Sequence, residues 1–389
     1  MEEKTYLPKI EINDTFATLS QVVDWGLRQS NVPETWKVTQ GEGVKVLVID
    51  TGFPTHIDIG DNAIEGANFV PGEPLEDENG HQSHCVGIIC AKNNGIGMVG
   101  VAPKSKAICV KALAKSGGGN YGGLSKALDY AIETKPDIVS MSLGGSVPSA
   151  MLESRIKKLY EMNIPVVCAA GNTGQGGVNW PAAYNETIAV AAHDKNGRVA
   201  SFSSRGEKVE WAAPGVNIYS TYLNNGYASL NGTSMACPFV AGVIALMLAK
   251  HKKQEQETGK NDCKTVEQIR EHLLKYTMDK GRIGKDNAWG YGVIDVEKLI
   301  GEQPEPEPEP KPEPEPEPKP EPEPDIPHPY PEPENPENPE EDAENWRRIL
   351  IKVGVVIAIG LASLTLSECN KEKPEVNWDE KFKKEMEAK

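Results

Sequence analysis

Short apolar runs alternate with amphipathic stretches through the middle of the chain. The runs at 44–50, 137–143 and 164–171 are rich in Val, Ile and other apolar residues, whereas 121–134 has the period of an amphipathic helix. Apolar strands that alternate with helices are typical of a parallel sheet covered on both faces. We therefore expect an α/β domain over residues 19–302, with its binding site at the carboxyl ends of the strands.

The segments outside this domain have different patterns. Residues 1–18 show no helical or strand period long enough to bury, so we expect a short extension. Residues 303–345 form a linker in which Pro and Glu alternate, and this composition predicts a disordered, extended spacer with nothing to bury. Residues 346–368 predict a single hydrophobic helix, and 369–389 form a polar tail.

The C-terminal apolar segment suggests a membrane anchor. Ile349–Leu366 is 18 residues long with only Lys352 charged, which is near the lower limit for crossing a bilayer. Trp346 and the two arginines after it suit a membrane interface, but lysines also follow the segment, so its orientation stays open. A transmembrane helix is the favoured interpretation, and a helix docked on this protein or on another chain is the alternative.

The N-terminal sequence indicates where the protein is located, and the distribution of charge indicates which partners it can have. The acidic N-terminus has no apolar stretch of signal-peptide length, so we expect a cytoplasmic domain anchored at its C-terminus. The formal net charge is −16, but residues 304–345 hold 14 Glu and 2 Asp against 2 Lys, which leaves the remainder nearly neutral. A nearly neutral domain argues against nucleic acid as a partner. The sequence does not indicate an oligomeric state.

The seven cysteines do not suggest a metal or redox motif. They lack the short-spaced pairs of such motifs, and most of them lie in apolar runs. We interpret them as reduced thiols, most of which fill the core.

Three polar residues stand where predicted strands and helices meet. Asp50 ends an apolar strand, where a buried carboxylate needs a partner, although a turn cap is the alternative. His81 precedes an apolar helix, where an exposed histidine is common, and a zinc site with His84 and Cys85 lacks a second ligand cluster. Ser234 begins another apolar helix, where serine is also an ordinary N-cap. A carboxylate, a base and a hydroxyl nucleophile are the three parts of acyl-transfer catalysis.

Several sequence blocks together resemble the subtilisin family of serine proteases. They are VLVIDTG, NGHQSHCVG, NNGIGMVGVAP, SMSLGG, CAAGN and NGTSMACPFVAG, and they span most of the predicted domain. The missing signal peptide, CAAGN and the later PAAYNETIAV make the chain most similar to the intracellular branch. The resemblance implies a subtilisin-like sheet with helices on both faces and a serine endopeptidase that acts on polypeptides through an acyl-enzyme.

The resemblance also implies the roles of the candidate catalytic residues. Ser234 matches the nucleophile, His81 the general base and acid, and Asp50 the carboxylate that orients the histidine. Asn172 matches the residue whose side-chain amide stabilises the oxyanion, although Gly-Asn after a strand otherwise indicates a turn. A silent subtilisin-like scaffold that binds peptides is the alternative function. The presence of all four residues favours the enzyme.

Two further segments match the walls of the family's substrate groove. The matching residues are Ser142, Leu143 and Gly144 on one side, and Gly118, Gly119 and, at a more distant subsite, Tyr121 on the other. Glycines there allow a polypeptide to bind as an added strand, because side chains would block its approach. Without the resemblance, both segments would indicate ordinary loops.

The block AKNNGIGMVG resembles the family's calcium loop. The implied ligands are the side chains of Asn94 and Asp58 and the backbone carbonyls of Lys92, Ile96 and Met98. Such hard oxygen donors suit Ca²⁺, and we expect the ion to stabilise the fold.

The N-terminal extension resembles a leader segment of the family. Intracellular members have a short leader over the active site, and Tyr6-Leu7-Pro8-Lys9 partly matches it, so we predict that residues 1–18 form an inhibitory prosegment. A disordered tail is the alternative, and removal by autoprocessing stays open.

The family's usual Gly-Thr is replaced here by Gln82-Ser83, which we expect to add bulk beside His81.

Overall fold

The structure is a computed structural model that describes residues 4–7, 11–16 and 20–301. Contacts divide the chain into two units, 1–306 and 307–389, and all described residues belong to the first. The predicted linker, transmembrane helix and polar tail lie outside the described residues.

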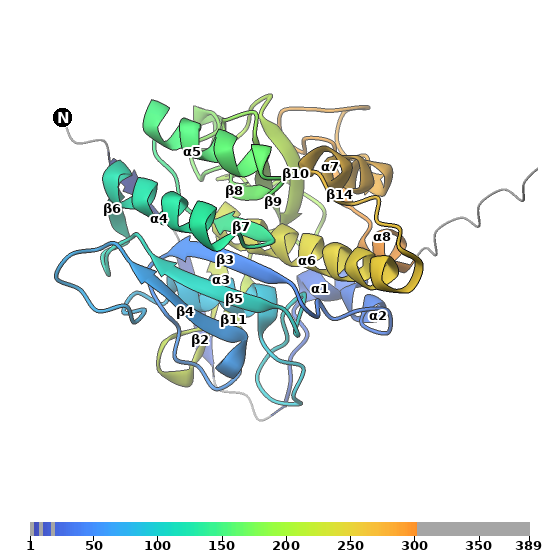
Figure 1. Cartoon of the computed structure of the whole chain (residues 1–389), viewed down its shortest axis with the longest axis horizontal. Helices are drawn as coiled ribbons and strands as arrows, with labels where there is room; N and C mark the ends of the chain where they lie inside the picture. The colour runs from blue at the N-terminus through green and yellow to red at the C-terminus, as the bar shows by residue number, and fades with distance from the viewer. Residues whose placement is uncertain (1–3, 8–10, 17–19, 302–389) are drawn as a thin grey trace, which may run out of the picture. The chain divides into compact units, whose positions relative to one another are not determined.

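Seven parallel strands form the central sheet, in the order β10-β9-β8-β7-β3-β5-β4 (Figure 1). Their bounds are β3 Lys45–Asp50, β4 Ala63–Asn68, β5 Lys106–Lys111, β7 Ile138–Met141, β8 Val166–Ala169, β9 Thr187–His193 and β10 Val209–Pro214. The predicted α/β fold with a parallel sheet is confirmed.

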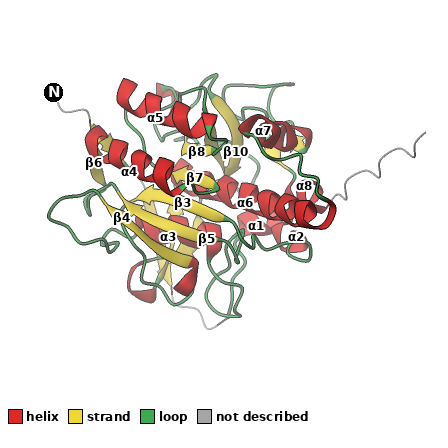
Figure 2. Cartoon of the chain, viewed as in Figure 1, coloured by secondary structure: helices red, strands yellow, loops and turns green. Residues whose placement is uncertain are grey.

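Helices cover both faces of this sheet (Figure 2). One face is covered by α3 (His81–Cys90) and α6 (Thr233–Thr258), and the other by α4 (Tyr121–Thr134) and α5 (Ala150–Glu161). The smaller helices are α1 Trp25–Gln29, α2 Val32–Thr35, α7 Val266–Lys275, α8 Val296–Gly301 and the 3₁₀ helices η1 Gly60–Asn62, η2 Gly174–Gly176 and η3 Leu223–Asn225.

Alternate side chains of one strand reach the two halves of the core. Val46 and Val48 of β3 pack with α3 and α6, whereas Leu47 and Ile49 pack with α4 and α5. Successive side chains of a strand point to opposite faces, and both faces are buried here. This is why the strand is apolar at consecutive positions.

Three small sheets complete the fold. The remaining strands are β1 Lys4–Tyr6, β2 Glu11–Phe16, β6 Gly118–Asn120, β11 Ile218–Thr221, β12 Tyr227–Asn231, β13 Thr277–Met278 and β14 Val293–Ile294. Their pairing is β1-β6, β11-β12-β2 and β13-β14, all antiparallel.

The N-terminal extension forms strands that its own pattern does not predict. Within residues 1–18, β1 pairs with β6 and β2 pairs with β12. Each strand takes its hydrogen-bond partners from a strand more than 100 residues away, so no local period is needed. The absence of a period in residues 1–18 therefore did not reveal these two strands.

The long helix α6 belongs to the core. Among the described residues it is the one helix long and apolar enough to cross a membrane, and 94% of its apolar window is buried inside the domain. The six cysteines of the described residues are unpaired and buried, which agrees with their interpretation as core thiols.

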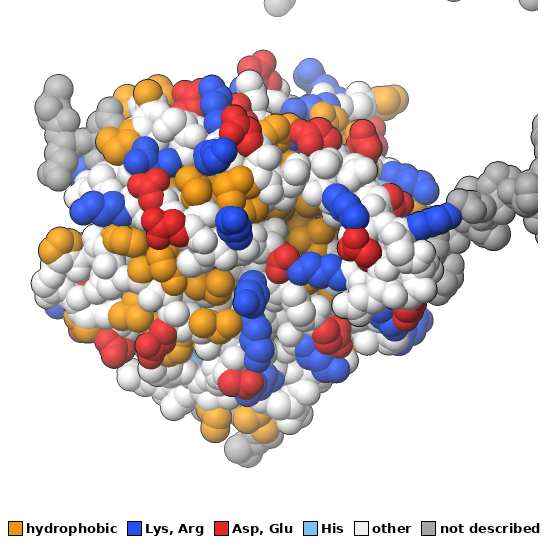
Figure 3. Space-filling view, viewed as in Figure 1, with side chains coloured by type: hydrophobic (Ala, Val, Ile, Leu, Met, Phe, Trp, Pro, Cys, Tyr) orange, Lys and Arg blue, Asp and Glu red, His pale blue; other side chains and the backbone are white. Residues whose placement is uncertain are grey.

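The surface of the domain carries mixed charge. On the face shown in Figure 3, Lys and Arg side chains are interspersed with Asp and Glu side chains. This agrees with the near-neutral charge of the chain outside residues 304–345.

Candidate active site

A buried carboxylate and a buried histidine meet at the carboxyl end of the sheet. Asp50 is the last residue of β3, and His81 is the first residue of α3. Nδ1 of His81 lies 2.7 Å from Oδ1 and 2.8 Å from Oδ2 of Asp50, and the Thr51 amide donates to Oδ1 at 2.8 Å. A carboxylate acceptor keeps the proton on Nδ1, which leaves Nε2 as the basic nitrogen of the neutral ring.

The charge of Asp50 controls the basicity of His81. Burial by itself would lower the pKa of His81, but the Asp50 carboxylate and Cys85 outweigh burial and hold that pKa well above its ordinary value. An opposite charge in contact favours the protonated ring. The pair can therefore accept a proton from a nearby hydroxyl more readily than an isolated buried imidazole can.

The loop before His81 is held by one carboxylate. Asp77 accepts hydrogen bonds from the Gly80 amide, from the Thr51 hydroxyl and from both the amide and the hydroxyl of Ser83. Gly80 has a φ of 94°, and a Cβ there would lie 2.5 Å from the Tyr222 ring. The turn therefore requires glycine, and it presents His81 in a rigid orientation.

Gln82 does not add bulk to the substrate side of His81. Its side chain is fully buried, and it accepts from the Gly52 amide at 2.6 Å and donates to the Val48 carbonyl at 3.3 Å. One residue along a helix rotates the side chain by about 100°, so Gln82 faces the sheet. The expected obstruction was wrong, and Gln82 instead braces the turn after Asp50.

Two hydrogen bonds join Ser234 to Ser142, the first residue of the segment that follows β7. The Ser234 hydroxyl donates to the Ser142 carbonyl at 3.2 Å, and the Ser142 hydroxyl donates to the Ser234 carbonyl at 2.9 Å. Cys85 Sγ also donates to the Ser234 carbonyl, at 3.4 Å, and lies 4.0 Å from Nε2 of His81. Cys85 therefore contacts both His81 and Ser234, so these two residues lie close to each other.

A proline inside α6 explains why the Ser234 carbonyl accepts these bonds. Pro238 lies four residues after Ser234 and has no amide hydrogen, so the helical bond to the Ser234 carbonyl cannot form. Ser142 and Cys85 donate to this carbonyl from outside the helix instead. They therefore orient the first turn of α6, which carries the nucleophile candidate.

Asn172 lies beside the first turn of α6. Its Oδ1 accepts from the Thr233 amide at 3.0 Å and from the Thr233 hydroxyl at 2.8 Å, which turns Nδ2 toward Gly232. A Cβ on Gly232 would lie 3.1 Å from Nδ2 of Asn172 and 3.5 Å from the Ser234 amide nitrogen. Gly232 therefore lies next to two nitrogen donors, the side-chain amide of Asn172 and the backbone amide of Ser234.

The zinc alternative does not include His84. Nε2 of His84 lies 3.0 Å from the carbonyls of both Ile218 and Ala228. Burial lowers the pKa of His84 to about 3. Its role is to hold β11 and β12 against α3.

The two predicted groove walls hold a strand of this same chain. In β1, Tyr6 is paired with Gly118 and Thr5 with Gly119, and Leu7 donates its amide to the Gly117 carbonyl at 3.0 Å. On the other side, Tyr6 and Gly144 exchange two hydrogen bonds of 2.9 and 3.0 Å. An extended peptide therefore lies between the two segments that the sequence singles out.

The other predicted groove residues lie behind this strand. Leu143 and Tyr121 are buried, and the Tyr121 hydroxyl donates to the Val147 carbonyl at 2.6 Å. Thr5 is fully buried, and a Cβ on Gly119 would lie 3.1 Å from its methyl group. Tyr121 thus belongs to the wall of the groove, with its hydroxyl directed at a neighbouring loop.

The predicted calcium residues surround one side chain that the sequence analysis missed. Nε2 of Gln21 lies 2.8 Å from the Lys92 carbonyl, 3.5 Å from Oδ1 of Asn94, and 3.4 Å from the carbonyls of both Ile96 and Met98. In the sequence this position is a single Gln between two loop residues. No local pattern identifies it as part of a binding site.

Asp58 completes this ring of oxygen atoms. Its carboxylate accepts from the Asn94 amide at 2.9 Å and from the Met98 amide at 2.7 Å, and burial raises the pKa of Asp58. If the side-chain amide of Gln21 is flipped by 180°, Oε1 takes the place of Nε2 and joins this ring of oxygen atoms. Three backbone carbonyls, two amide oxygens and one carboxylate are a donor set that fits Ca²⁺.

Comparison with known proteins agrees with this architecture. The subtilase family profile matches residues 41–292. The chain is 41% identical over 290 residues to M-protease of Shouchella clausii, an overlap of 74% of this chain and 72% of that protein. It is 42% identical over 280 residues to Subtilisin Savinase of Lederbergia lenta, which covers 72% of this chain and 98% of that protein. A thermostable alkaline protease of Halalkalibacterium halodurans is 44% identical over 279 residues, with 71% and 73% covered.

Proposed function

Because this chain belongs to the subtilase family and is a subtilisin-like serine endopeptidase, we propose that Asp50, His81 and Ser234 form its catalytic triad. The observation that carries this proposal is the buried contact of Nδ1 of His81 with both carboxylate oxygens of Asp50, beside the first turn of α6. Asn172 and the Ser234 amide supply the donors for the oxyanion.

The proposed reaction proceeds in two halves. The Ser234 hydroxyl oxygen attacks the peptide carbonyl carbon while Nε2 of His81 takes the hydroxyl proton, and Asn172 stabilises the negative oxygen. His81 then gives its proton to the leaving amide nitrogen, the C–N bond breaks, and an acyl-enzyme forms. Water repeats the attack, and His81 returns a proton to Ser234. Asp50 holds the ring and stabilises its charged form throughout.

A silent peptide-binding scaffold is the second candidate, because a peptide strand already lies in the groove. A fluorophosphonate probe distinguishes the two functions, since it reacts only with an activated serine. We expect the probe to label Ser234 in protein that lacks residues 1–18, with Ser234→Ala as the unlabelled control. No labelling of that protein would favour the scaffold.

We further propose that residues 1–18 form an inhibitory prosegment. The pairing of β1 with β6 and with Gly144 supports this role, because an extended peptide that joins two walls of a groove binds as a substrate does. While β1 is bound, a polypeptide substrate cannot use the same backbone partners. The prosegment thus competes with substrate from within the chain.

Deleting residues 1–18 is therefore expected to raise peptidase activity on a small peptide substrate by at least about tenfold, since a tethered segment competes at a millimolar effective concentration. A synthetic peptide of residues 1–18 added to the truncated enzyme should inhibit it. Thermal melts must accompany the assay, because the deletion also removes β2 from β12. Equal activity of the full and truncated enzymes would refute the prosegment.

We propose that the ring around Gln21 binds Ca²⁺. Gln21, Asp58 and Asn94 would contribute side-chain oxygens, and Lys92, Ile96 and Met98 would contribute backbone carbonyls. The ion would join the chain near Gln21 to the loop after α3, and it has no role in the proton transfers.

Chelation of Ca²⁺ is expected to lower the melting temperature of the Ser234→Ala protein by on the order of 5–10 °C, because an ion bound only by the folded state stabilises it by mass action. Gln21→Ala should reduce this difference, whereas Gln29→Ala, a surface glutamine on α1, should leave it intact. Equal melting temperatures with and without chelator would contradict the proposed Ca²⁺ site.

We also propose that the peptidase domain is cytoplasmic and tethered to a membrane by residues 346–368, as in an intracellular subtilisin with an added anchor. The sequence supports this arrangement through the apolar stretch at 349–366. The Pro/Glu spacer from 304 to 340 would hold the domain up to about 110 Å from the surface at about 3.1 Å per residue.

Full-length protein is expected to pellet with membranes and to resist carbonate extraction, because a spanning helix does not leave the bilayer when peripheral contacts are broken. A chain ending at residue 345 should stay in the supernatant and cleave small peptides equally well. Full-length protein found wholly in the supernatant would favour a docked helix instead.

A further inference from the structure

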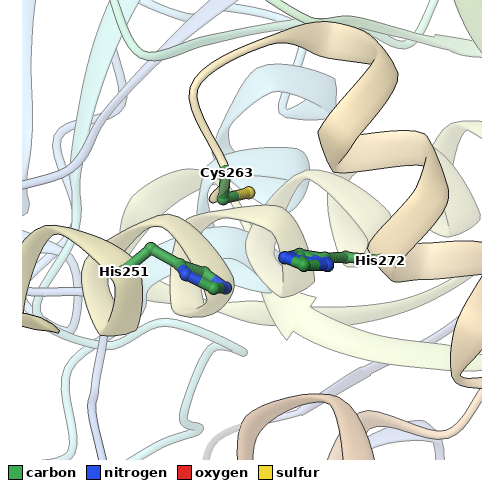
Figure 4. Close-up of side chains that lie close together, drawn as sticks. All are labelled: His251, Cys263 and His272. Carbon is green, nitrogen blue, oxygen red and sulfur yellow. The ribbon is translucent and has the colours of Figure 1, made fainter. Parts of the chain in front are cut away.

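Three metal-ligating side chains meet far from the proposed active site. His251 lies in the last third of α6, Cys263 lies in the loop after it, and His272 lies in α7 (Figure 4). Their possible ligand atoms all lie within 4.8 Å of one another. His251 is 17 residues after Ser234 on one helix, about 25 Å away, so this cluster is separate from the triad.

The rings of the two histidines face each other in this cluster. Their rings point toward one another from α6 and α7, with centroids 4.9 Å apart and planes inclined by 15° (Figure 4). His251 is 7% exposed, and Nδ1 of His251 and Nε2 of His272 are buried beside the Asp262 carboxylate. One carboxylate oxygen lies at 2.9 and 3.5 Å from these two nitrogens, and a metal ion at this point would satisfy both of them.

A carboxylate lies beside the same two nitrogen atoms. Oδ1 of Asp262 is 2.9 Å from Nδ1 of His251 and 3.5 Å from Nε2 of His272. Neighbouring ligands of a tetrahedral zinc ion are about 3.3–3.6 Å apart, given bond lengths of about 2.0–2.3 Å. The Asp262 oxygen is at this spacing from His272, and a shift of less than about 1 Å away from His251 would make it a fourth ligand.

The loop that carries Cys263 is built rigidly. The Cys263 amide donates to Oδ1 of Asn261 at 2.9 Å, and the Asn261 amide donates to Glu255 on α6 at 2.9 Å. Thr265 and Gln268 form a capping box at the start of α7. These bonds hold the Cys263 thiol at 3% exposure against both helices.

We propose that His251, Cys263, His272 and Asp262 bind one zinc ion, which fastens α7 and its loop to α6. A thiolate with two imidazoles and a carboxylate is a tetrahedral donor set for Zn²⁺, whereas Ca²⁺ prefers oxygen ligands alone. Binding replaces the thiol proton of Cys263 with the metal and draws the ligand atoms together by up to about 1.5 Å, since they lie within 4.8 Å before it.

The surroundings suit this exchange. Both histidine side chains are largely buried, so little water competes for their ring nitrogens. Cys263 and Asn261 also line a surface hollow of about 520 Å³, which provides a route for the ion from solvent. The bound ion would stabilise the fold, because it joins α7 and its loop to α6.

Cobalt substitution tests the site without relying on catalysis. Full-length Ser234→Ala protein, saturated with Ca²⁺ and unable to digest itself, is titrated with Co²⁺ and then with Zn²⁺. We expect one Co²⁺ per chain, with the thiolate-to-cobalt charge-transfer band and the strong visible bands of tetrahedral coordination, and we expect Zn²⁺ to abolish both.

Variants identify the thiolate. Cys263→Ser should weaken Co²⁺ binding by more than about 100-fold and remove the charge-transfer band, since even outer-shell partners are worth roughly 10- to 100-fold. His272→Asn should weaken binding similarly. The matched control is Cys85→Ala, which alters the other cluster of Asp50, His81 and Cys85 and should keep the band.

Each outcome is decisive when circular dichroism confirms that the variants are folded. A band that survives in Cys263→Ser, a band lost in Cys85→Ala, or no band in the parent would overturn the zinc site. In support, Zn²⁺ should raise the melting temperature of the parent by several degrees and that of Cys263→Ser by none. Failure of this test leaves the proposed triad unaffected.

Discussion

Ser234→Ala is expected to lower kcat by on the order of a million-fold, the loss measured for the equivalent change in a subtilisin. The substitution removes the oxygen that forms the acyl-enzyme. It leaves the buried contact of Asp50 with His81, and the Ser234 carbonyl still accepts from Ser142 and Cys85. The fold should therefore be retained, and the loss should lie in chemistry.

The measurement is kcat and KM on a small peptide substrate with enzyme that lacks residues 1–18. Ser154→Ala, an exposed serine on α5, is the matched control and should keep full activity. Some catalysis above the rate in water should remain in Ser234→Ala, because the oxyanion donors still polarise a bound carbonyl. Activity of Ser234→Ala within tenfold of the parent would contradict the assignment of the nucleophile.

Asn172→Leu is expected to lower kcat by about 100- to 1,000-fold with little change in KM, the range known for the oxyanion asparagine of a subtilisin. Nδ2 of Asn172 lies near Gly232 and the Ser234 amide, where the negative oxygen of the tetrahedral intermediate would lie. A donor that meets charge only in the transition state affects turnover rather than substrate binding.

A second variant separates this role from a structural one. Asn172→Asp keeps an oxygen that accepts from the Thr233 amide and hydroxyl, but it has no amide hydrogen to donate. It should melt near the parent temperature and still lose turnover. Asn185→Ala, at an exposed asparagine, is the control. If KM rises while kcat holds in Asn172→Leu, the residue binds substrate and does not stabilise the oxyanion.

The sequence by itself determined the layered fold. Consecutive apolar positions in 44–50 require burial on both faces, and that condition holds in a parallel sheet covered by helices. It also located the polar residues where strands end and helices begin, among them Asp50, His81 and Ser234. These features depend on neighbours along the chain, so a local pattern is sufficient to predict them.

Only the tertiary structure decided which way side chains point and what they meet. Gln82 is adjacent to His81 in sequence, yet it faces the sheet, because one helical step turns it away. Gln21 joins a loop more than 70 residues later, and β1 takes its partners from β6 and from Gly144.

The cluster at the end of α6 is the strongest case. His251, Cys263 and His272 are separated by 11 and 8 intervening residues, which is not the spacing of a familiar zinc motif. They meet because α7 folds back on α6 and the loop between the helices brings the thiol within 4.8 Å of both histidines. A sequence pattern records distance along the chain, whereas a binding site depends on distance in space, and the packing of two helices sets that distance.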